Sequence, residues 1–311
     1  SEERYSGLEG EIAKLDARGI RFLGYVNPYL AADGYLFTEA ERHGYLCRRT
    51  DSDAVYLVDF GEFECGVVDL TNPAACNWFA ERVLGQEMLD IGMSGWMADF
   101  GEYLPTDLRL SDGGDPMELH NHWPVLWAEL NDRAIALRGK GGDATFFMRA
   151  GFSGVQAHCP LLWAGDQSVD FSRHDGIGTV ITAALSAGLL GSSISHSDCG
   201  GYTSLHGNVR TSELMQRWCE LSAFSPVMRT HEGNRPDDNL QYDSTDELQE
   251  CFVRWSRIHA ALAPYLKEVC SEGSQTGIPA QRPLFLEYAG WENLFGIQDQ
   301  FLLGPDLLVA P

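Results

Sequence analysis

Short apolar runs and amphipathic segments alternate along nearly the whole chain, and this alternation most constrains the fold. Apolar runs of strand length stand at 20–26, 93–99, 144–151 and 159–166, and a further strand is predicted at 191–198. Segments with apolar residues at helical spacing flank them, at 8–19, 71–92, 121–138 and 176–190. Repeated strand–helix units with apolar strands are typical of a parallel sheet covered by helices. The pattern therefore predicts an α/β fold.

The later part of the chain continues the pattern, with helices predicted near 211–221 and 245–270 and a strand at 282–288. The six or seven strand candidates are fewer than the eight that close a (β/α)8 barrel. A first strand or two upstream of Ser1 would complete the set. We therefore expect residues 1–311 to be a TIM-barrel catalytic domain that is truncated at both ends, because the chain opens on Ser1 rather than Met and closes on the apolar run "FLLGPDLLVAP".

The charge of the chain excludes some classes of partner. With 45 acidic and 22 basic residues the formal net charge is −23, and nucleic acids and anionic membranes are bound mainly through Lys and Arg. We expect neither as a partner. The eight cysteines are dispersed without a CxxC pair, which favours buried thiols in a reducing compartment and hence a cytoplasmic location.

Polar or ionisable side chains stand where several of the expected strands end. They are Asp99, Arg149, Asp166, Asp198 and His231. In a barrel of this class the carboxyl ends of all strands open onto one face, and the catalytic groups lie there. We expect the five side chains to face a substrate, although Asp198, followed by two glycines, is equally explained as the brace of a tight turn.

Asp99 and Asp166 suit glycoside hydrolysis. Cleavage of an acetal needs one carboxyl group to protonate the leaving oxygen and another to stabilise the oxocarbenium-like centre. Trp96 and Trp163, close to these two residues in the chain, are expected to present ring faces to a sugar. Other groupings are weaker: "HNH" at 120–122 resembles a metal cluster and "RPDDN" at 235–239 a calcium loop, but surface or capping roles are more common, and we expect neither metal nor cofactor.

The motifs resemble a known family. "GWMADFGEYLPTD", "WAGDQ", "HSDCGGY", "MRTHEGNRP" and "FLLGPDLLVAP" occur in the order and at the spacing of glycoside hydrolase family 31. Within that family the chain looks like the sulfoquinovosidase branch, whose members cleave α-linked sulfoquinovose from glycosides derived from sulfolipid. The resemblance covers nearly the whole chain. Family members also carry flanking β-domains, which we expect to be absent from residues 1–311.

The resemblance implies a retaining mechanism through a covalent glycosyl-aspartate. Asp99 matches the nucleophile and Asp166 the general acid/base, and the two carboxyl groups of a retaining enzyme lie about 5–5.5 Å apart. Arg149 and His231 match residues that bind the sugar hydroxyls. Tyr202 matches a tyrosine that holds the sulfonate through a water. The arginine and tryptophan that bind the sulfonate in this branch match positions upstream of Ser1.

Three other functions are weighed against this hypothesis. An α-glucosidase or another α-glycosidase for neutral sugars would use the same two aspartates. A non-catalytic carbohydrate-binding barrel would lack one of them, and a metal-dependent hydrolase would need histidines clustered at strand ends. We expect a small-molecule glycoside as the partner; the sequence leaves homo-oligomer formation open.

Overall fold

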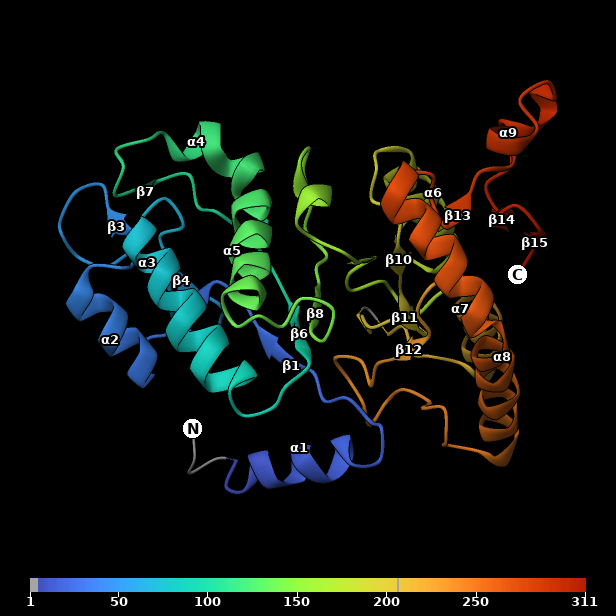
Figure 1. Ribbon diagram of the computed structural model, residues 1–311, viewed down its shortest axis with the longest axis horizontal. Coiled ribbons are helices and arrows are strands. Elements are labelled where there is room, and N and C mark those ends of the chain that lie inside the picture. The colour runs from blue at the N-terminus through green and yellow to red at the C-terminus, as the bar shows by residue number, and fades with distance from the viewer. Residues whose placement is uncertain (1–4, 206) are drawn as a thin grey trace. The chain divides into compact units, whose positions relative to one another are not determined.

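The computed structural model describes residues 5–205 and 207–311. Its contacts divide the chain into two compact units, Ser1–Pro160 and Leu161–Pro311, which run from blue to green and from yellow-green to red in Figure 1. Both units mix helices and strands, in agreement with the α/β class expected from the sequence.

The first unit has its helices and strands in alternation. Its helices are α1 (Leu8–Asp16), α2 (Tyr35–His43), α3 (Pro73–Trp78), the π-helix η1 (Phe79–Leu89), α4 (Pro116–Leu119), α5 (Trp123–Leu137) and the 3-10 turns η2 (His120–His122) and η3 (Val155–Ala157). Its strands are β1 (Gly24–Val26), β2 (Tyr29–Ala31), β3 (Arg48–Arg49), β4 (Leu57–Asp59), β5 (Glu64–Val67), β6 (Gly95–Ala98), β7 (Leu108–Arg109) and β8 (Thr145–Phe147).

A parallel sheet forms the centre of this unit, with β6 between β1 and β8. The register pairs Val26 with Ala98 and Trp96 with Phe146. Helix α5 packs against β8 and η1, beside the sheet (Figure 1). The side chains between these layers, among them Trp96, Phe146 and Trp127, are fully buried, so the predicted apolar strands are core strands.

The predicted helix over 71–92 is confirmed, and its first turn forms for a local reason. The side chain of Asn72 accepts hydrogen bonds from the backbone N–H groups of Ala74 and Ala75, and Pro73 stands at the first helical position. Such a cap satisfies backbone donors that have no partner within the helix. The helix continues from α3 into η1 and ends before Gly92, whose φ is 98°.

Residues 51–70 contain two strands. These are β4 and β5, which pair antiparallel, and β5 also pairs antiparallel with β2. The antiparallel strands β3 and β7 form a further small sheet. These segments depart from the parallel sheet that the strand–helix alternation predicts.

The second unit has longer helices and shorter strands. Its helices are α6 (Ile177–Leu189), α7 (Ser212–Ala223), α8 (Asp246–Thr276), α9 (Leu284–Glu287) and the 3-10 turn η4 (Glu292–Leu294). Its strands are β9 (Leu162–Trp163), β10 (Ser195–His196), β11 (Asp198–Cys199), β12 (Arg229–Thr230), β13 (Gln281–Arg282), β14 (Phe301–Leu303) and β15 (Leu307–Val309). Strand β10 pairs parallel with β9, and β11 pairs parallel with β12.

Helices α7 and α8 pack against each other over the core of the second unit (Figure 1). Their first turns are capped by the side chains of Thr211 and Thr245, which accept hydrogen bonds from the N–H groups of Leu214 and Leu248. Trp218, on α7, is fully buried in this core. The helices predicted near 211–221 and 245–270 are therefore confirmed, and α8 extends to Thr276.

The strand predicted at 282–288 is wrong. Only β13 is a strand, and Pro283 after it begins the short helix α9. A proline has no N–H to donate to a strand ladder, so the strand ends there. The side chain of Arg282, which is 3% exposed, also favours this turn because it forms ion pairs with Glu272 and Glu287.

Of the barrel expected from the sequence, the structure shows parallel strands and accompanying helices. The parallel strands of residues 5–205 and 207–311 form three sheets, β1–β6–β8, β9–β10 and β11–β12, and no closed barrel. None of the helices in these ranges has the length and apolar character to cross a membrane.

The close approach of β6 and β8 at Gly95 predicts a large effect of a single methyl group. Gly95 has a φ of 136°, and a Cβ there would lie 1.7 Å from the carbonyl oxygen of Thr145. Gly95→Ala should lower the free energy of unfolding by about 3 kcal/mol or more, from strained backbone and overpacking together. Urea unfolding followed by circular dichroism measures this.

The control is Gly113→Ala, because Gly113 also has a positive φ, 76°, but open space around it. It should cost about 1–2 kcal/mol. Equal losses of unfolding free energy in the two variants would show that the close contact between β6 and β8 does not cause the effect of Gly95→Ala.

Candidate active site

Asp99 directly follows β6, and its carboxylate is held where the strand becomes a loop. Its backbone N–H donates to the carbonyl of Val26 on β1 over 2.8 Å, so strand pairing extends to this residue. Phe100 then has a φ of 56°, and its N–H donates to Asp99 Oδ1 over 2.8 Å. Residues other than glycine rarely adopt this conformation, so a strained turn stands beside the carboxylate.

Two side chains from the neighbouring strands of the sheet orient the Asp99 carboxylate. Tyr25 Oη, on β1, donates to Asp99 Oδ2 over 2.6 Å. Arg149, two residues after β8, forms an ion pair with its Nε 3.3 Å from Asp99 Oδ1. Each oxygen thus has a donor or a cation beside it, in a side chain that is 11% exposed. The strand-end position predicted for Asp99 and Arg149 is confirmed, and the two side chains meet.

Arg149 is itself fixed by a second carboxylate. Its Nε donates to Glu102 Oε1 over 2.9 Å, and its Nη2 lies 2.7 Å from the same oxygen. The guanidinium carbon lies 4.5 Å from the ring centroid of Phe100, within the range of a cation–π contact. Glu102 is therefore the second carboxylate partner of Arg149.

Trp96 does not present its ring to a substrate, so that prediction is wrong. Its side chain is fully buried, and its Nε1 donates to Asn131 Oδ1 over 2.7 Å. Side chains alternate between the two faces of a strand, and Trp96 takes the face that packs against α5. Tyr25, which sequence reasoning missed, is the aromatic residue that contacts Asp99.

Asp166 follows β9 in the second unit, and its side chain is exposed. The chain turns at Gly165, whose φ is 88°. The carbonyl of Asp166 accepts a hydrogen bond from Thr203 Oγ1 over 2.7 Å, and the carbonyl of Gln167 accepts from the N–H of Tyr202 over 2.9 Å. The backbone of Asp166 is therefore tied to the segment that carries Tyr202, another of the predicted site residues.

Arg229 links three strand positions of the second unit. Its Nε donates to His196 Nε2 over 3.1 Å, it forms an ion pair with the buried Asp198, and its guanidinium lies 5.9 Å from the ring centroid of Trp163. Burial lowers the pKa of Arg229, and the charges of Asp198 and Asp166 oppose this. The sequence left the role of Asp198 open between structural and functional. In the structure its carboxylate is the ion-pair partner of Arg229.

His196 is a neutral part of this cluster. Burial, and then the charge of Arg229, lower its pKa from 6.5 to about 3. Its Nδ1 lies 3.1 Å from the carbonyl oxygen of Leu162, and its Nε2 accepts from Arg229. These partners fit the tautomer with the proton on Nδ1. Trp163, which pairs with His196 across the sheet, is 3% exposed.

The structure brings Tyr202 and His231 together. Their rings make an edge contact with centroids 4.8 Å apart. His231 Nδ1 accepts a hydrogen bond from the N–H of Gly233 over 3.0 Å, which fits the tautomer with the proton on Nε2. The two residues belong to loops that follow β11 and β12.

The two motifs considered as metal sites have structural roles. In "HNH", His120 Nδ1 lies 2.7 Å from the carbonyl oxygen of Leu104, and in "RPDDN", Asn239 is buried and bonded to Ser204 and Arg210. Within residues 5–205 and 207–311, no group of three or more His, Cys, Asp or Glu side chains could hold a metal ion.

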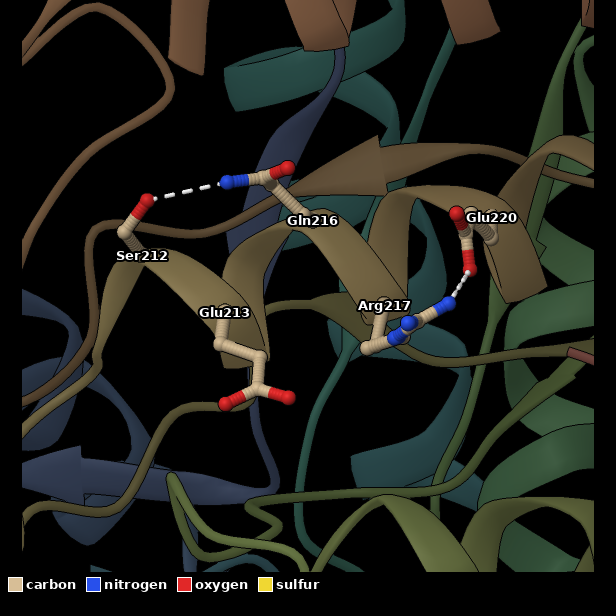
Figure 2. Close-up of a pocket in the computed structure, with 5 residues that line it drawn as sticks. All are labelled: Ser212, Glu213, Gln216, Arg217 and Glu220. Carbon is tan, nitrogen blue, oxygen red and sulfur yellow. Dashed lines mark hydrogen bonds and ion pairs between the residues drawn. The ribbon is translucent and has the colours of Figure 1, made fainter. Parts of the chain in front are cut away.

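A surface hollow of about 360 Å³ lies on α7 (Figure 2), lined by Ser212, Glu213, Gln216, Arg217 and Glu220. Its polar side chains bond to one another: Gln216 Nε2 donates to Ser212 Oγ over 3.0 Å, and Arg217 Nη1 to Glu220 Oε2 over 2.9 Å. None of these residues is a predicted site residue.

Comparison with known proteins points to one family. Residues 1–269 match the model described as "Glycosyl hydrolases family 31 TIM-barrel domain", and residues 277–311 match "Glycosyl hydrolase family 31 C-terminal domain". A sulfoquinovosidase of Agrobacterium fabrum is 60% identical over 311 residues, which are 100% of this chain and 47% of the relative. A sulfoquinovosidase of Escherichia coli is 49% identical over 309 residues, 99% of this chain and 45% of the relative.

A solved structure has the same fold. The family 31 sulfoquinovosidase from E. rectale, in complex with an aza-sugar inhibitor, superimposes with a TM-score of 0.97 at 52% identity. The match covers 100% of this chain and 46% of that structure. The chain thus spans about half the length of the relatives it matches.

The neutral state of His196 predicts a pH dependence of stability. Between pH 6.5 and about 3 the unfolded chain takes up a proton on His196 that the folded chain excludes, so acid should favour unfolding. In His196→Asn this loss should be absent. The free energy of unfolding of the wild type should therefore fall by about 2 kcal/mol more than that of the variant between pH 7 and pH 5.

Urea unfolding at the two pH values measures the difference. The exposed His174 supplies the matched control, and His174→Asn should behave as the wild type does. If His196→Asn and the wild type lose stability in parallel, His196 is not held neutral.

Proposed function

The chain belongs to glycosyl hydrolase family 31, and on this basis we propose that it carries the catalytic machinery of a retaining α-glycosidase that cleaves α-sulfoquinovosides. The observation that carries the proposal is the Asp99 carboxylate, fixed at a strand end between Tyr25 Oη and the guanidinium of Arg149. The identity of 60% to a sulfoquinovosidase over the whole chain supports the substrate class.

In the first step Asp99 is the nucleophile. One carboxylate oxygen attacks the anomeric carbon, the bond to the aglycone oxygen breaks, and Asp166 donates its proton to that oxygen. The product is a covalent glycosyl-aspartate. Oriented donors keep the carboxylate aligned for attack, and the strained turn at Phe100 keeps the carboxylate at the strand end.

In the second step Asp166 is the base. It takes a proton from water, the hydroxyl attacks the anomeric carbon, and Asp99 leaves as a carboxylate, so that the sugar keeps its α configuration. The exposure of Asp166 suits a group that exchanges protons with water. Arg149 and His231 would bind the sugar hydroxyls, and Tyr202 would hold the sulfonate through a water.

We propose two further properties of the protein. The first is that this chain contributes most of a (β/α)8 barrel that acts as one catalytic domain; the parallel pairing of β1, β6 and β8 and the match of residues 1–269 support it, whereas residues 277–311 match the C-terminal domain. The second is a cytoplasmic location, which is supported by buried free thiols such as Cys47, Cys65 and Cys219.

The test compares an aryl α-sulfoquinovoside with the matching aryl α-glucoside, using the full-length protein that contains this chain. We expect kcat/KM to be about 100-fold higher for the sulfonated sugar, because a site with polar groups arranged for one substituent rejects the analogue without it. A preference for the glucoside would contradict the proposed sulfoquinovoside substrate. It would instead favour an α-glucosidase that uses the same two aspartates. Asp99→Asn should lower kcat on either substrate by about 10³-fold or more, and the exposed Asp143→Asn serves as the matched control.

The role of Asp166 makes a separate prediction. Asp166→Asn should lower kcat/KM about 100-fold or more for an alkyl glycoside, whose leaving oxygen needs a proton, and much less for a nitrophenyl glycoside. Steady-state rates over a series of leaving groups measure the difference. Equal losses along the series would contradict the assignment of Asp166 as the acid.

A further inference from the structure

Arg210 is a buried arginine whose bonds differ from those of Arg229 and Arg282 in the same unit, which form ion pairs with carboxylates. Its side chain is 1% exposed, and burial lowers its pKa. Within the part of the chain that the structure describes, its hydrogen bonds go to three backbone carbonyls and one side-chain amide, and none goes to a carboxylate. A buried guanidinium is costly unless its donors are satisfied, so this one is held by the loops around it.

The first of these loops leads into Tyr202. Arg210 Nε donates to the carbonyl of Gly200 over 2.8 Å, and Nη2 donates to the carbonyl of Gly201 over 2.5 Å. Gly200 has a φ of 94°, and a Cβ there would lie 2.7 Å from Arg210 Nε. Glycine at this position therefore lets the backbone approach the guanidinium closely, one residue before Gly201 and two before Tyr202.

The second loop follows His231. Arg210 Nη1 donates to the carbonyl of Leu240 and to Gln241 Oε1, each over 3.3 Å. Gln241 Nε2 donates in turn to the carbonyl of Glu232, the residue next to His231, over 3.0 Å. The backbone N–H of Arg210 also donates to Asn239 Oδ1 over 2.8 Å. Arg210 thus bonds directly to residues 239–241, and Gln241 connects that end of the loop to Glu232, beside His231.

The two loops are also bonded to each other, beside Arg210. Ser204 Oγ donates to Asn239 Oδ1 over 2.8 Å, and the N–H of Asn234 donates to the carbonyl of Tyr202 over 3.1 Å. A Cβ on Gly233 would lie 2.9 Å from that same carbonyl oxygen. The edge contact between the Tyr202 and His231 rings therefore depends on how closely the two loops are drawn together.

We propose that Arg210 is a positioning residue that sets the placement of Tyr202 relative to His231, and through Tyr202 the preference for an anionic sugar. The inference rests on the proposed function, because Tyr202 is there given the sulfonate. Arginine suits the task because its planar fork can donate in several fixed directions at once, whereas the ammonium of lysine is a single point of contact.

The experiment is a double-mutant cycle of Arg210→Lys and Tyr202→Phe in the full-length protein. Its readout is the ratio of kcat/KM for an aryl α-sulfoquinovoside to that for the aryl α-glucoside. Each single variant should lower the ratio about tenfold, and the double variant should lower it little further, because both changes remove the same interaction. A loss of fold alone would lower both rates and leave the ratio unchanged.

The matched control is Arg217→Lys, an exposed arginine on α7 (Figure 2), which should keep the ratio of the wild type. Equal losses on both substrates in Arg210→Lys, or losses that multiply in the double variant, would overturn the proposal. Ser204→Ala serves if Arg210→Lys does not fold, because it removes one bond between the loops; it should lower the ratio about threefold, and an unchanged ratio would count against the proposal.

A wild type that does not cleave the sulfoquinovoside contradicts the proposed function and not the role of Arg210. In that case the cycle pairs Arg210→Lys with His231→Gln on the glycoside that is cleaved. Coupled losses in kcat/KM then support positioning by Arg210, and independent losses overturn it.

Discussion

The parallel pairing of β6 with β1 and β8 is the constraint on which the candidate site depends. It brings Tyr25, Asp99 and Arg149 into contact although they are far apart in the sequence. A slip of one residue would turn the side chains of a strand to its other face, so the register decides whether Asp99 points to the loop end or into the core. The approach of Gly95 to Thr145 favours a single register, because only a glycine fits there.

Two arginines of the second unit, the half-buried Arg229 and the fully buried Arg210, meet the cost of withdrawal from water in different ways. Arg229 has a buried carboxylate, Asp198, and a neutral histidine, His196, as partners, so its charge is balanced within the cluster. Arg210 is bonded to backbone carbonyls and to Gln241, so its charge is spread over the dipoles of two loops. An ion pair fixes one side chain against another, whereas bonds to carbonyls fix the course of the backbone. This difference explains why Arg210 can determine where a loop residue such as Tyr202 lies.

Two local features of the site lower the stability of the folded state, and both are typical of functional sites. Phe100 has a strained backbone, and Asp99 and Arg149 are largely withdrawn from water. Such features persist when the surrounding structure supplies compensating contacts, and they concentrate where a reacting group must be oriented before the substrate arrives. The retaining mechanism that we propose for this chain requires such an oriented carboxylate.

The sequence by itself determined what depends on near neighbours in the chain. The cap of Asn72, the helices around it and the position of Asp99 at the end of a strand follow from spacing and local hydrogen bonding, and the motif order was sufficient to identify the family. Tertiary structure decided the rest, because packing partners far apart in sequence leave no periodic signal. It turned Trp96 into the core towards Asn131, where a sugar platform was expected, and it joined the loops of Tyr202 and His231 through Arg210. A strand pattern states which residues alternate, but only the neighbouring strands and helices decide which face is buried.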